Sequence, residues 1–437
     1  DTAGSTEIQP IKENPDRKKA VRVFVFHRNF RLSGKNIFTG KLSDRSKPFS
    51  KVHLPENVSG RDEKGEKMTD EFYMRRAIEL AKKGRGWTNP NPMVGAVIVK
   101  NGSIIGEGYH EKCGELHAER NAIASLTESA EGATLYVTLE PCCHYGKTPP
   151  CTEAILEQKI ARVVIGSRDP NPKVSGKGAK ILREAGVRVE EDFLREECDA
   201  LNPVFFHYIT TGLPYVVMKY AMTADGKIAT KTGASKWISG EEARSLVHEM
   251  RHDYMAIMAG IGTVLADDPM LNVRLEGKKS PVRIICDSML RIPLDSQICQ
   301  TAGRYRTIVA YAGEKGNAIC LEEKKHSLEK LGVVLLSVPS EKGEINLQLL
   351  MRKLGELGID SVLIEGGGTL NEDALQSGIV NEVKAFIAPK IFGGRGGKTP
   401  VEGFGVEKVD DAIKLQLMRI SQVGEDILAE YKVLEEM

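Results

Sequence analysis

The sequence lacks the features of several large classes of protein. No apolar run approaches the roughly 20 residues that a membrane-spanning helix requires, and no secretory signal pattern opens the chain. Neither sign of charge is in excess, because 61 Lys and Arg residues face 60 Asp and Glu residues, for a formal net charge of +1. The chain therefore has no general electrostatic attraction to nucleic acid or to an anionic membrane, and we expect neither as a partner.

Cysteine is also sparse. Eight cysteines in 437 residues do not make the disulfide scaffold of a small secreted protein, so metal binding or catalysis in a reducing compartment is the better interpretation. The length suffices for roughly two or three domains with at least one well-buried core. Together these features predict a cytoplasmic globular protein.

The chain divides into three parts. Residues 1–67 are rich in Lys, Arg, Ser and Asn and show no sustained period beyond Val21–Phe26. We assign them no function, treat them as an extension that need not be folded, and expect Met68 to be a natural start. Residues 68–210 and residues 214–437 each show the alternation of strand and helix patterns that indicates an α/β domain.

The two domains differ in the order of their elements. In the first, the strand-like runs 94–99 and 103–109 flank an Asn-Gly pair, a strong hairpin signal, and helices then alternate with strands. This order predicts a three-layer sandwich with a mixed sheet. In the second, buried strands alternate with helices, and Ser239 with Glu242 predicts a capping box at the start of one helix.

The most informative chemistry lies in His117-Ala118-Glu119, followed by Pro141-Cys142 and Pro150-Cys151. One imidazole and two thiolates form a ligand set that suits Zn²⁺ and leaves a fourth tetrahedral position open for water. Zinc lowers the pKa of bound water toward neutrality. Glu119 is placed to take a proton from that water and to pass it to a leaving amine. The pattern predicts one catalytic zinc ion and a hydrolytic deamination.

The spacing of the two cysteines distinguishes between families of zinc deaminases. Zinc deaminases of nucleobases carry His-x-Glu and then Pro-Cys-x-x-Cys, whereas eight residues separate Cys142 from Cys151 here. The intervening string, Cys143-His144-Tyr145-Gly146-Lys147-Thr148-Pro149-Pro150, resembles the deaminase domain of the bifunctional riboflavin-biosynthesis family. His144 and Lys147 in this string suit a phosphorylated substrate. The resemblance implies a cytidine-deaminase-like fold, in which Asn91 of the segment Thr88–Gly95 reads the pyrimidine edge with His110 nearby.

The second domain carries a loop typical of phosphate binding. In Ile364-Glu365-Gly366-Gly367-Gly368-Thr369-Leu370, a strand pattern leads through glycines into a helix pattern. Such a loop directs backbone N–H groups and a helix N-terminus at an anion. Arg251 and Arg274 are suited to bind a phosphate through paired hydrogen bonds, and Lys219 and Asp267 are candidates for tuning a hydride acceptor.

With Lys219–Ala229, Ser235–Gly240 and Gly260–Pro269, this loop resembles the reductase domain of the same family, which is similar in fold to dihydrofolate reductase. The resemblance implies NADPH, since no residue pattern here separates NADPH from NADH. The cofactor contacts that it implies are Ala221, Trp237, Thr263, Asp267, Gly366, Gly367, Gly368 and Thr369. The substrate contacts that it implies are Ser235, Arg251, Leu271, Arg274 and Glu365.

The same resemblance implies the substrate and the assembly. The substrate is a pyrimidine nucleotide, 2,5-diamino-6-ribosylamino-4(3H)-pyrimidinone 5′-phosphate, which is deaminated before its ribosyl group is reduced to the ribityl form. The family resemblance also suggests a homo-oligomer.

Several alternatives stay open on the residues alone. Cys142 and Cys151 could form a disulfide in an oxidising compartment. A nucleic-acid-editing deaminase would carry a shorter cysteine spacing and a basic face, and a non-catalytic relative would have lost Glu119 or a metal ligand. A chain in which only one domain works also stays open.

Overall fold

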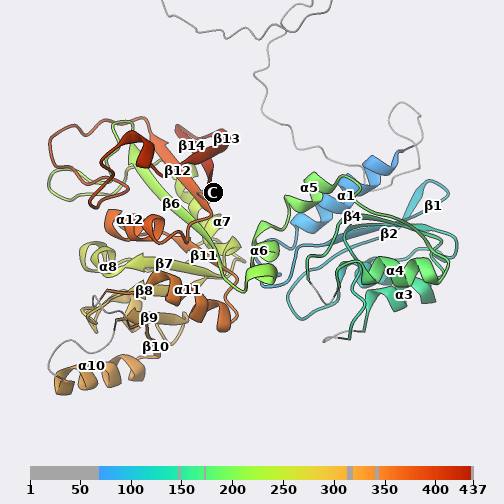
Figure 1. Cartoon of the computed structure of the whole chain (residues 1–437), viewed down its shortest axis with the longest axis horizontal. Coiled ribbons are helices and arrows are strands. Elements are labelled where there is room, and N and C mark those ends of the chain that lie inside the picture. The colour runs from blue at the N-terminus through green and yellow to red at the C-terminus, as the bar shows by residue number, and fades with distance from the viewer. Residues whose placement is uncertain (1–67, 146–148, 172–173, 313–317, 340–343, 435–437) are drawn as a thin grey trace, which may run out of the picture. The chain divides into compact units, whose positions relative to one another are not determined.

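The computed structural model describes residues 68–434 apart from 146–148, 172–173, 313–317 and 340–343. Residues 1–67 and Lys147, for which expectations were stated above, lie outside the described residues. The described chain builds one five-stranded and one nine-stranded sheet, and helices accompany both sheets (Figure 1).

The five-stranded sheet is mixed, as predicted. Its order is β2-β1-β3-β4-β5, in which β1 pairs antiparallel with β2 and β3, and β3, β4 and β5 run parallel. Asn101 and Gly102 have positive φ angles of 52° and 84°, which is the geometry that an Asn-Gly hairpin turn requires. The strands are β1 (Gly95–Lys100), β2 (Ser103–Tyr109), β3 (Thr134–Leu139), β4 (Arg162–Ser167) and β5 (Arg188–Glu190).

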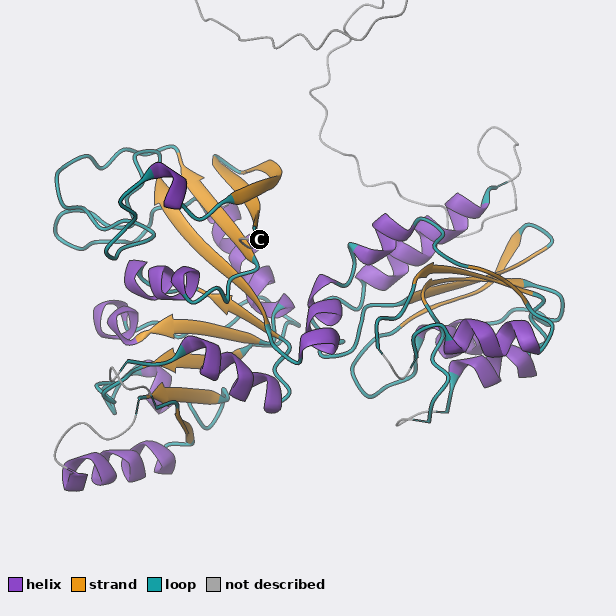
Figure 2. Ribbon diagram, viewed as in Figure 1, coloured by secondary structure: helices purple, strands orange, loops and turns teal. Residues whose placement is uncertain are grey.

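Helices pack on both faces of this sheet and complete a three-layer sandwich, which Figure 2 shows nearly edge-on. One apolar cluster joins the first face to α1 (Asp70–Lys82) and α5 (Arg195–Asp199). The helices on the other face share a second cluster with the sheet. They are α2 (Ala118–Ala124), α3 (Cys151–Glu157), α4 (Lys177–Glu184) and α6 (Pro203–Thr211).

The nine-stranded sheet has the order β10-β9-β8-β7-β11-β6-β12-β14-β13. Its strands run parallel from β10 to β12, and β14 and β13 then add antiparallel pairs. The first seven strands are β6 (Tyr215–Thr223), β7 (Ala256–Gly260), β8 (Val282–Cys286), β9 (Thr307–Tyr311), β10 (Val333–Ser337), β11 (Ser361–Ile364) and β12 (Glu382–Ala388). The last two are β13 (Leu415–Val423) and β14 (Asp426–Val433).

Helices cover both faces of this sheet as well. One face packs against α11 (Leu347–Glu356) and α12 (Gly368–Gln376). The other face packs against α7 (Glu241–Asp253), α8 (Ile261–Asp267), α9 (Gln297–Gln300) and α10 (Ala318–Lys330). A short 3₁₀ turn, η1 (Val409–Asp411), precedes β13. The α/β expectation is therefore confirmed for both sheets.

The structure departs from the sequence-based expectations in three places. The helix-capping prediction for Ser239 is wrong: Gly240 is the N-cap of α7, and its N–H donates to Oδ2 of Asp426 at 2.7 Å. The end of the first predicted domain contains α6, a helix that none of the patterns named above predicted. The antiparallel pair β13–β14 was not expected, because β13 is exposed along most of its length and lacks a buried face to signal it.

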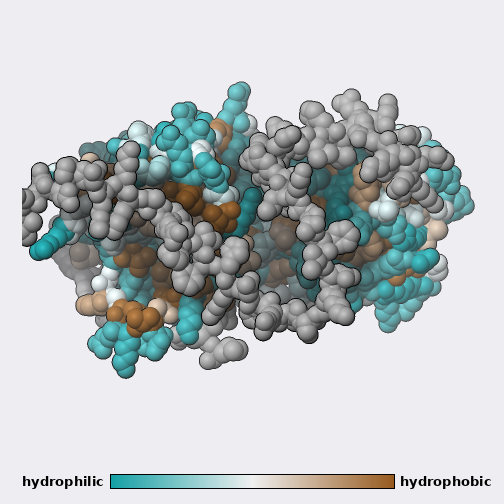
Figure 3. Space-filling model, turned by 90° about the horizontal axis from the view of Figure 1, so that it is seen from above, coloured by the Kyte–Doolittle hydropathy of each residue, from teal (hydrophilic) through white to brown (hydrophobic). Residues whose placement is uncertain are grey.

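Hydrophilic side chains cover the outer parts of the face drawn in Figure 3, and hydrophobic side chains are visible between them. Over the part of the chain that the structure describes, no helix combines the length and the apolar character needed to cross a membrane.

Candidate active sites

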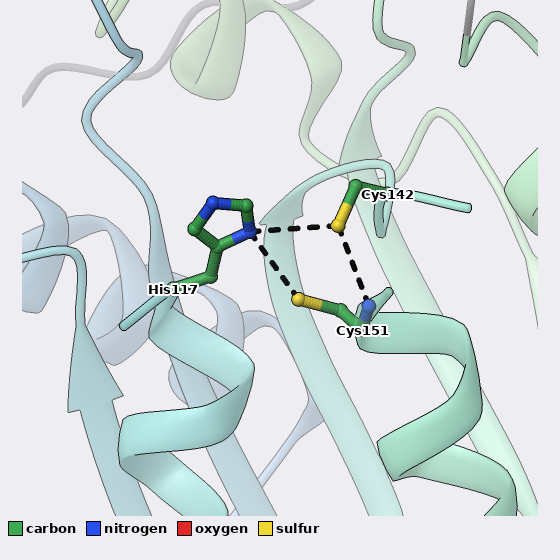
Figure 4. Close-up of side chains that lie close together, drawn as sticks. All are labelled: His117, Cys142 and Cys151. Atoms are coloured by element: carbon green, nitrogen blue, oxygen red, sulfur yellow. Dashed lines mark hydrogen bonds between the residues drawn. The ribbon is translucent and has the colours of Figure 1, made fainter. Parts of the chain in front are cut away.

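The first candidate site is formed by three residues from three segments (Figure 4). His117 is the N-cap of α2, Cys151 is the first residue of α3, and Cys142 lies in the loop that follows β3. Nδ1 of His117 lies 3.5 Å from Sγ of Cys142 and 3.4 Å from Sγ of Cys151. Both cysteines are free thiols, so the structure has no disulfide between them.

These distances fit a tetrahedral zinc ion. With Zn–S bonds of about 2.3 Å and Zn–N bonds of about 2.0–2.1 Å, ligand atoms in a tetrahedral site lie roughly 3.5–3.8 Å apart. All three donor atoms lie within 4.8 Å of one another. The donor set is one imidazole and two thiols, which suits zinc and leaves a fourth position for water.

The local electrostatics prepare Cys142 to be a thiolate. Hydrogen bonds to Cys142, first from Cys151 and then from His117, lower the pKa of its thiol. The backbone N–H of Cys151 also donates to Sγ of Cys142 at 3.3 Å, at the first turn of α3. The pKa of Cys151 is raised by its hydrogen bond to Cys142 and by burial. A divalent ion would favour the thiolate of both residues.

Glu119 lies in the first turn of α2, two residues beyond the His117 cap. Only 4% of the residue is exposed, and burial raises the pKa of its carboxyl group. A carboxyl group with a raised pKa exchanges protons more readily near neutral pH. The burial of Glu119 and the raised pKa of its carboxyl group are compatible with the proton-transfer role predicted for it.

His110 and Asn91 form a hydrogen-bonded pair next to the cluster. Nδ1 of His110 lies 2.9 Å from the Leu116 carbonyl oxygen, and its Nε2 lies 3.2 Å from Nδ2 of Asn91. Because a carbonyl can only accept, Nδ1 carries the hydrogen and Nε2 accepts from the amide of Asn91. The rings of His110 and His117 pack edge to face, with 5.5 Å between their centroids. The sequence prediction that these residues lie together is confirmed.

The loop between the cysteines is less informative. His144 is exposed, and Lys147 lies outside the described residues.

The segment that follows β4 was not predicted to belong to this site. Backbone N–H groups of Gly176 and Ala179 in this segment donate to the carboxylate of Glu140 at 2.9 and 3.2 Å. Burial raises the pKa of Asp169 in this segment to about 6. The signal was the string Asp169-Pro170-Asn171 directly after a buried strand.

The second candidate site is a cleft of about 1250 Å³ beside the nine-stranded sheet. Every cofactor and substrate contact expected in the second domain lines it. They are Ala221, Ser235, Trp237, Arg251, Thr263, Asp267, Leu271, Arg274, Glu365, Gly366, Gly367, Gly368 and Thr369.

The glycine loop connects β11 to α12, whose N-cap is Gly367. A Cβ atom on Gly368 would lie 2.6 Å from Cγ of Glu402 and 2.8 Å from the Thr399 carbonyl oxygen. A side chain at this position would collide with its neighbours, so glycine is favoured there, and Gly366, Gly367 and Gly368 all line the cleft. Such a helix N-terminus is a ready site for an anionic group.

A buried charge cluster lies in the same cleft. Nε and Nη2 of Arg251 donate to the two carboxylate oxygens of Glu365 at 2.6 and 3.0 Å, and Nζ of Lys219 lies 3.4 Å from Oε2. Burial opposes ionisation, but Arg251 and then Lys219 outweigh it and lower the pKa of Glu365 to about 2. Glu365 is therefore an anion at neutral pH.

Several lining residues were not expected. His248, Ser288, Arg291 and Lys398 line the cleft. Ser288 and Arg291 follow β8, and the carboxyl end of a parallel strand is where α/β sheets bind ligands, so position after a buried strand was the available signal. His248 precedes Arg251 by three residues on α7 and therefore shares its face.

Comparison with known proteins gives two family matches. Residues 67–167 match the family described as the cytidine and deoxycytidylate deaminase zinc-binding region, and residues 214–429 match the RibD C-terminal domain. These matches agree with Zn²⁺ and NADPH as the cofactors of a deaminase and a reductase joined in one enzyme. They also confirm the predicted combination of a cytidine-deaminase-like sandwich with a reductase domain.

Curated relatives match over most of this chain and over nearly all of their own length. The riboflavin biosynthesis protein RibD of Actinobacillus pleuropneumoniae is 58% identical over 367 residues, which cover 84% of this chain and 96% of that protein. RibD of Escherichia coli is 40% identical over 377 residues, covering 82% and 98%.

Solved structures agree. One form of Acinetobacter baumannii RibD has a TM-score of 0.75 at 38% identity and covers 84% of this chain and 99% of that one. A Thermotoga maritima diaminohydroxyphosphoribosylaminopyrimidine deaminase/5-amino-6-(5-phosphoribosylamino)uracil reductase has a TM-score of 0.73 at 40% identity, covering 83% and 98%. The chain thus belongs to the RibD family of riboflavin biosynthesis proteins, which join a deaminase and a reductase in one polypeptide.

Proposed function

We propose that the chain acts on 2,5-diamino-6-ribosylamino-4(3H)-pyrimidinone 5′-phosphate, first removing its 2-amino group and then reducing its ribosyl side chain to ribityl. The observation that carries this proposal is the presence of two sites in one chain: a His-Cys-Cys cluster beside a buried glutamate, and a cleft lined by a glycine loop, Arg251 and Arg274. Each site suits one of the two reactions.

In the deaminase site, His117, Cys142 and Cys151 would hold the zinc ion, which supplies hydroxide at neutral pH when it is bound. Glu119 accepts a proton from the attacking water and returns it to the 2-amino group, which leaves as ammonia. Its burial and its raised pKa support this exchange. The hydrogen bond from Asn91 to His110 directs the amide oxygen of Asn91 away from the histidine, where it can accept from an N–H of the pyrimidine.

His144 and Lys147 complete the proposed contacts of this site. Both belong to the loop between the two cysteines, and a cation and an imidazole there suit the 5′-phosphate of the substrate.

In the reductase site, NADPH supplies the hydride when it is bound. We assign its contacts to Ala221, Trp237, Thr263, Asp267 and the loop of Gly366, Gly367, Gly368 and Thr369, all of which line the cleft. We assign the substrate contacts to Ser235, Arg251, Leu271, Arg274 and Glu365. Nζ of Lys219 and the Glu365 carboxylate place opposite charges side by side, where they can orient the ribose hydroxyls.

We further propose that the deaminase domain spans residues 68–210 and the reductase domain residues 214–437, with no role assigned to residues 1–67. The five-stranded sheet ends at Glu190 and the nine-stranded sheet begins at Tyr215, which supports a boundary between them.

We propose a homo-oligomer that forms through β13. Among the described residues this strand is the edge of its sheet, and a bulge between Leu417 and Arg419 keeps Leu415, Leu417 and Ile420 on one face of the ladder. Those three side chains are 40%, 51% and 61% exposed. An exposed apolar edge is self-complementary, because a second copy can pair with it antiparallel. Leu417→Lys with Ile420→Lys should lower the mass measured by light scattering to that of a monomer; an unchanged mass would contradict this interface.

We also propose a cytoplasmic location. Thiolate ligands such as Cys142 and Cys151 require reducing surroundings. Cell fractionation would test this, and recovery of the protein from an oxidising compartment would contradict it.

The decisive experiment follows ammonia release and NADPH oxidation together in zinc-loaded protein supplied with the diaminopyrimidinone nucleotide. Ammonia release followed by stoichiometric NADPH loss is expected. Ammonia release without NADPH loss would refute the reductase assignment for this chain. If neither ammonia release nor NADPH loss is observed, the proposed substrate is refuted. Glu119→Gln should keep zinc and lose about 10²–10⁴-fold in deamination, whereas the exposed Glu128→Gln should match wild type.

A further inference from the structure

His248 contacts an arginine that we place at the substrate phosphate. It lies on α7, three residues before Arg251, and both line the reductase cleft. Nε2 of His248 lies 3.3 Å from Nε and 3.2 Å from Nη2 of Arg274. A guanidinium group has only donors, so Nε2 must be the acceptor nitrogen, and the hydrogen of the neutral ring sits on Nδ1.

The surroundings keep this ring neutral. Burial, followed by the positive charges of Arg251 and Arg274, lowers the pKa of His248 to about 4, against the opposing influence of Glu365 and the Asn272 backbone. Nδ1 is buried and has no hydrogen bond of ordinary geometry within the described residues. At neutral pH the imidazole therefore accepts from Arg274 without altering the charge of the guanidinium.

Arg251 and Arg274 consequently differ in charge balance. Arg251 is paired with Glu365 through two hydrogen bonds, so this carboxylate, which Lys219 also contacts, offsets part of its charge. Among the described residues no carboxylate forms an ion pair with Arg274, and its Nε–Nη2 edge is directed at His248. The outer Nη1–Nη2 edge remains, and this edge can bind two phosphate oxygens at once.

We propose that His248 is a positioning residue of the reductase: a neutral acceptor that holds the Arg274 guanidinium so that its outer edge and its full positive charge meet the substrate phosphate. This inference rests on the proposed function, in which Arg274 contacts that phosphate. An aspartate or glutamate at position 248 could also orient the guanidinium, but it would compensate the charge on which the phosphate depends. An imidazole orients Arg274 and leaves its charge intact.

The test measures steady-state reduction of the deaminated nucleotide by wild type, His248→Leu, His248→Gln, Arg274→Leu and the double variant His248→Leu/Arg274→Leu. A hydrogen bond to a charged group is typically worth a factor of about ten or more. We therefore expect His248→Leu to raise KM for the nucleotide about tenfold, with kcat and KM for NADPH changed less than about twofold. Glutamine offers an acceptor oxygen near the position of Nε2, so His248→Gln should restore most of the loss.

The possible results distinguish a failure of the positioning role of His248 from a failure of the proposed function. In the Arg274→Leu background the histidine substitution should have no further effect, because the group that it orients is gone. An equal loss in both backgrounds, or a loss in His248→Gln as large as in His248→Leu, would overturn the positioning role. An unchanged KM in Arg274→Leu would instead overturn the assignment of Arg274. Hydrogen exchange of peptides from β6, β7 and β11 reports the folding of the reductase domain in the same variants, and the exposed His326→Gln on α10 is the matched control.

Discussion

The buried charge cluster of Lys219, Arg251 and Glu365 allows one prediction to be worked out in numbers. Their side chains are 13%, 15% and 9% exposed, so solvent screens these charges weakly. The cluster lowers the pKa of Glu365 from 4.5 to about 2. Since each pKa unit corresponds to about 1.4 kcal/mol, the ionised carboxylate stabilises the fold by roughly 3 kcal/mol at neutral pH.

Glu365→Gln keeps the shape of the side chain and removes its charge. We expect it to lower the free energy of unfolding of the reductase domain by about 3 kcal/mol at pH 7, because two buried cations lose their counter-charge. The folded-state pKa of Glu365 is depressed, so its contribution is complete above pH 4.5 and disappears as the pH falls toward 2. The difference between wild type and variant should shrink over that range.

Native-state hydrogen exchange of peptides from β6, β7 and β11 measures the opening of this sheet separately from the other domain. Glu249→Gln is the control, because Glu249 of the same domain pairs with Lys278 at the surface, with 43% and 34% of the side chains exposed, and such pairs contribute about 0–1 kcal/mol. A loss in Glu365→Gln no larger than in this control would refute the reasoning that the cluster is desolvated.

Three further outcomes follow from other parts of the structure. Gly95→Ala should lower the free energy of unfolding by more than about 3 kcal/mol and abolish zinc retention, because the added Cβ would lie 1.9 Å from the Ala77 carbonyl oxygen. Gly303→Ala is the control, because a Cβ at that position meets no atom within 4 Å. Equal melting temperatures for the two variants would contradict the packing argument. Gly368→Ala should raise KM for NADPH and leave ammonia release unchanged, since a Cβ there meets Glu402 and the Thr399 backbone; an unaltered KM would speak against the loop as the cofactor site. Removal of zinc by a chelator should stop ammonia release and spare reduction of the deaminated nucleotide, and a parallel loss of both activities would argue against independent sites.

The alternation of apolar runs predicted most of the sheets, because buried parallel strands are continuous apolar stretches between helices. The pair β13–β14 was not predicted, because β13 contains no buried residue and so lacks an apolar run. Its place in the sheet is set by pairing with β14. The cap of α7 was mispredicted because Asp426, distant in sequence, binds the N–H of Gly240. Local pattern carries no information on such a partner.

The candidate sites were predictable where residues form contiguous strings. His117, Cys142 and Cys151 stand in short motifs whose chemistry limits the interpretation. The glycine loop does the same for the reductase. His248 could not be identified in this way, because its meaning depends on Arg274, which reaches it from a separate segment. Only the folded structure shows which residues of different segments lie next to one another.

The strand order of the nine-stranded sheet has a consequence for synthesis of the chain. β6 is made first, yet it lies between β11 and β12, whose residues Ser361 and Glu382 pair with Tyr215 and Val217. The five-stranded sheet is complete by Glu190 and can fold while the ribosome continues. The apolar β6 must instead wait, unpaired, until nearly the whole protein has emerged. This interval is the period in which the nascent chain is most exposed to aggregation and most in need of a chaperone.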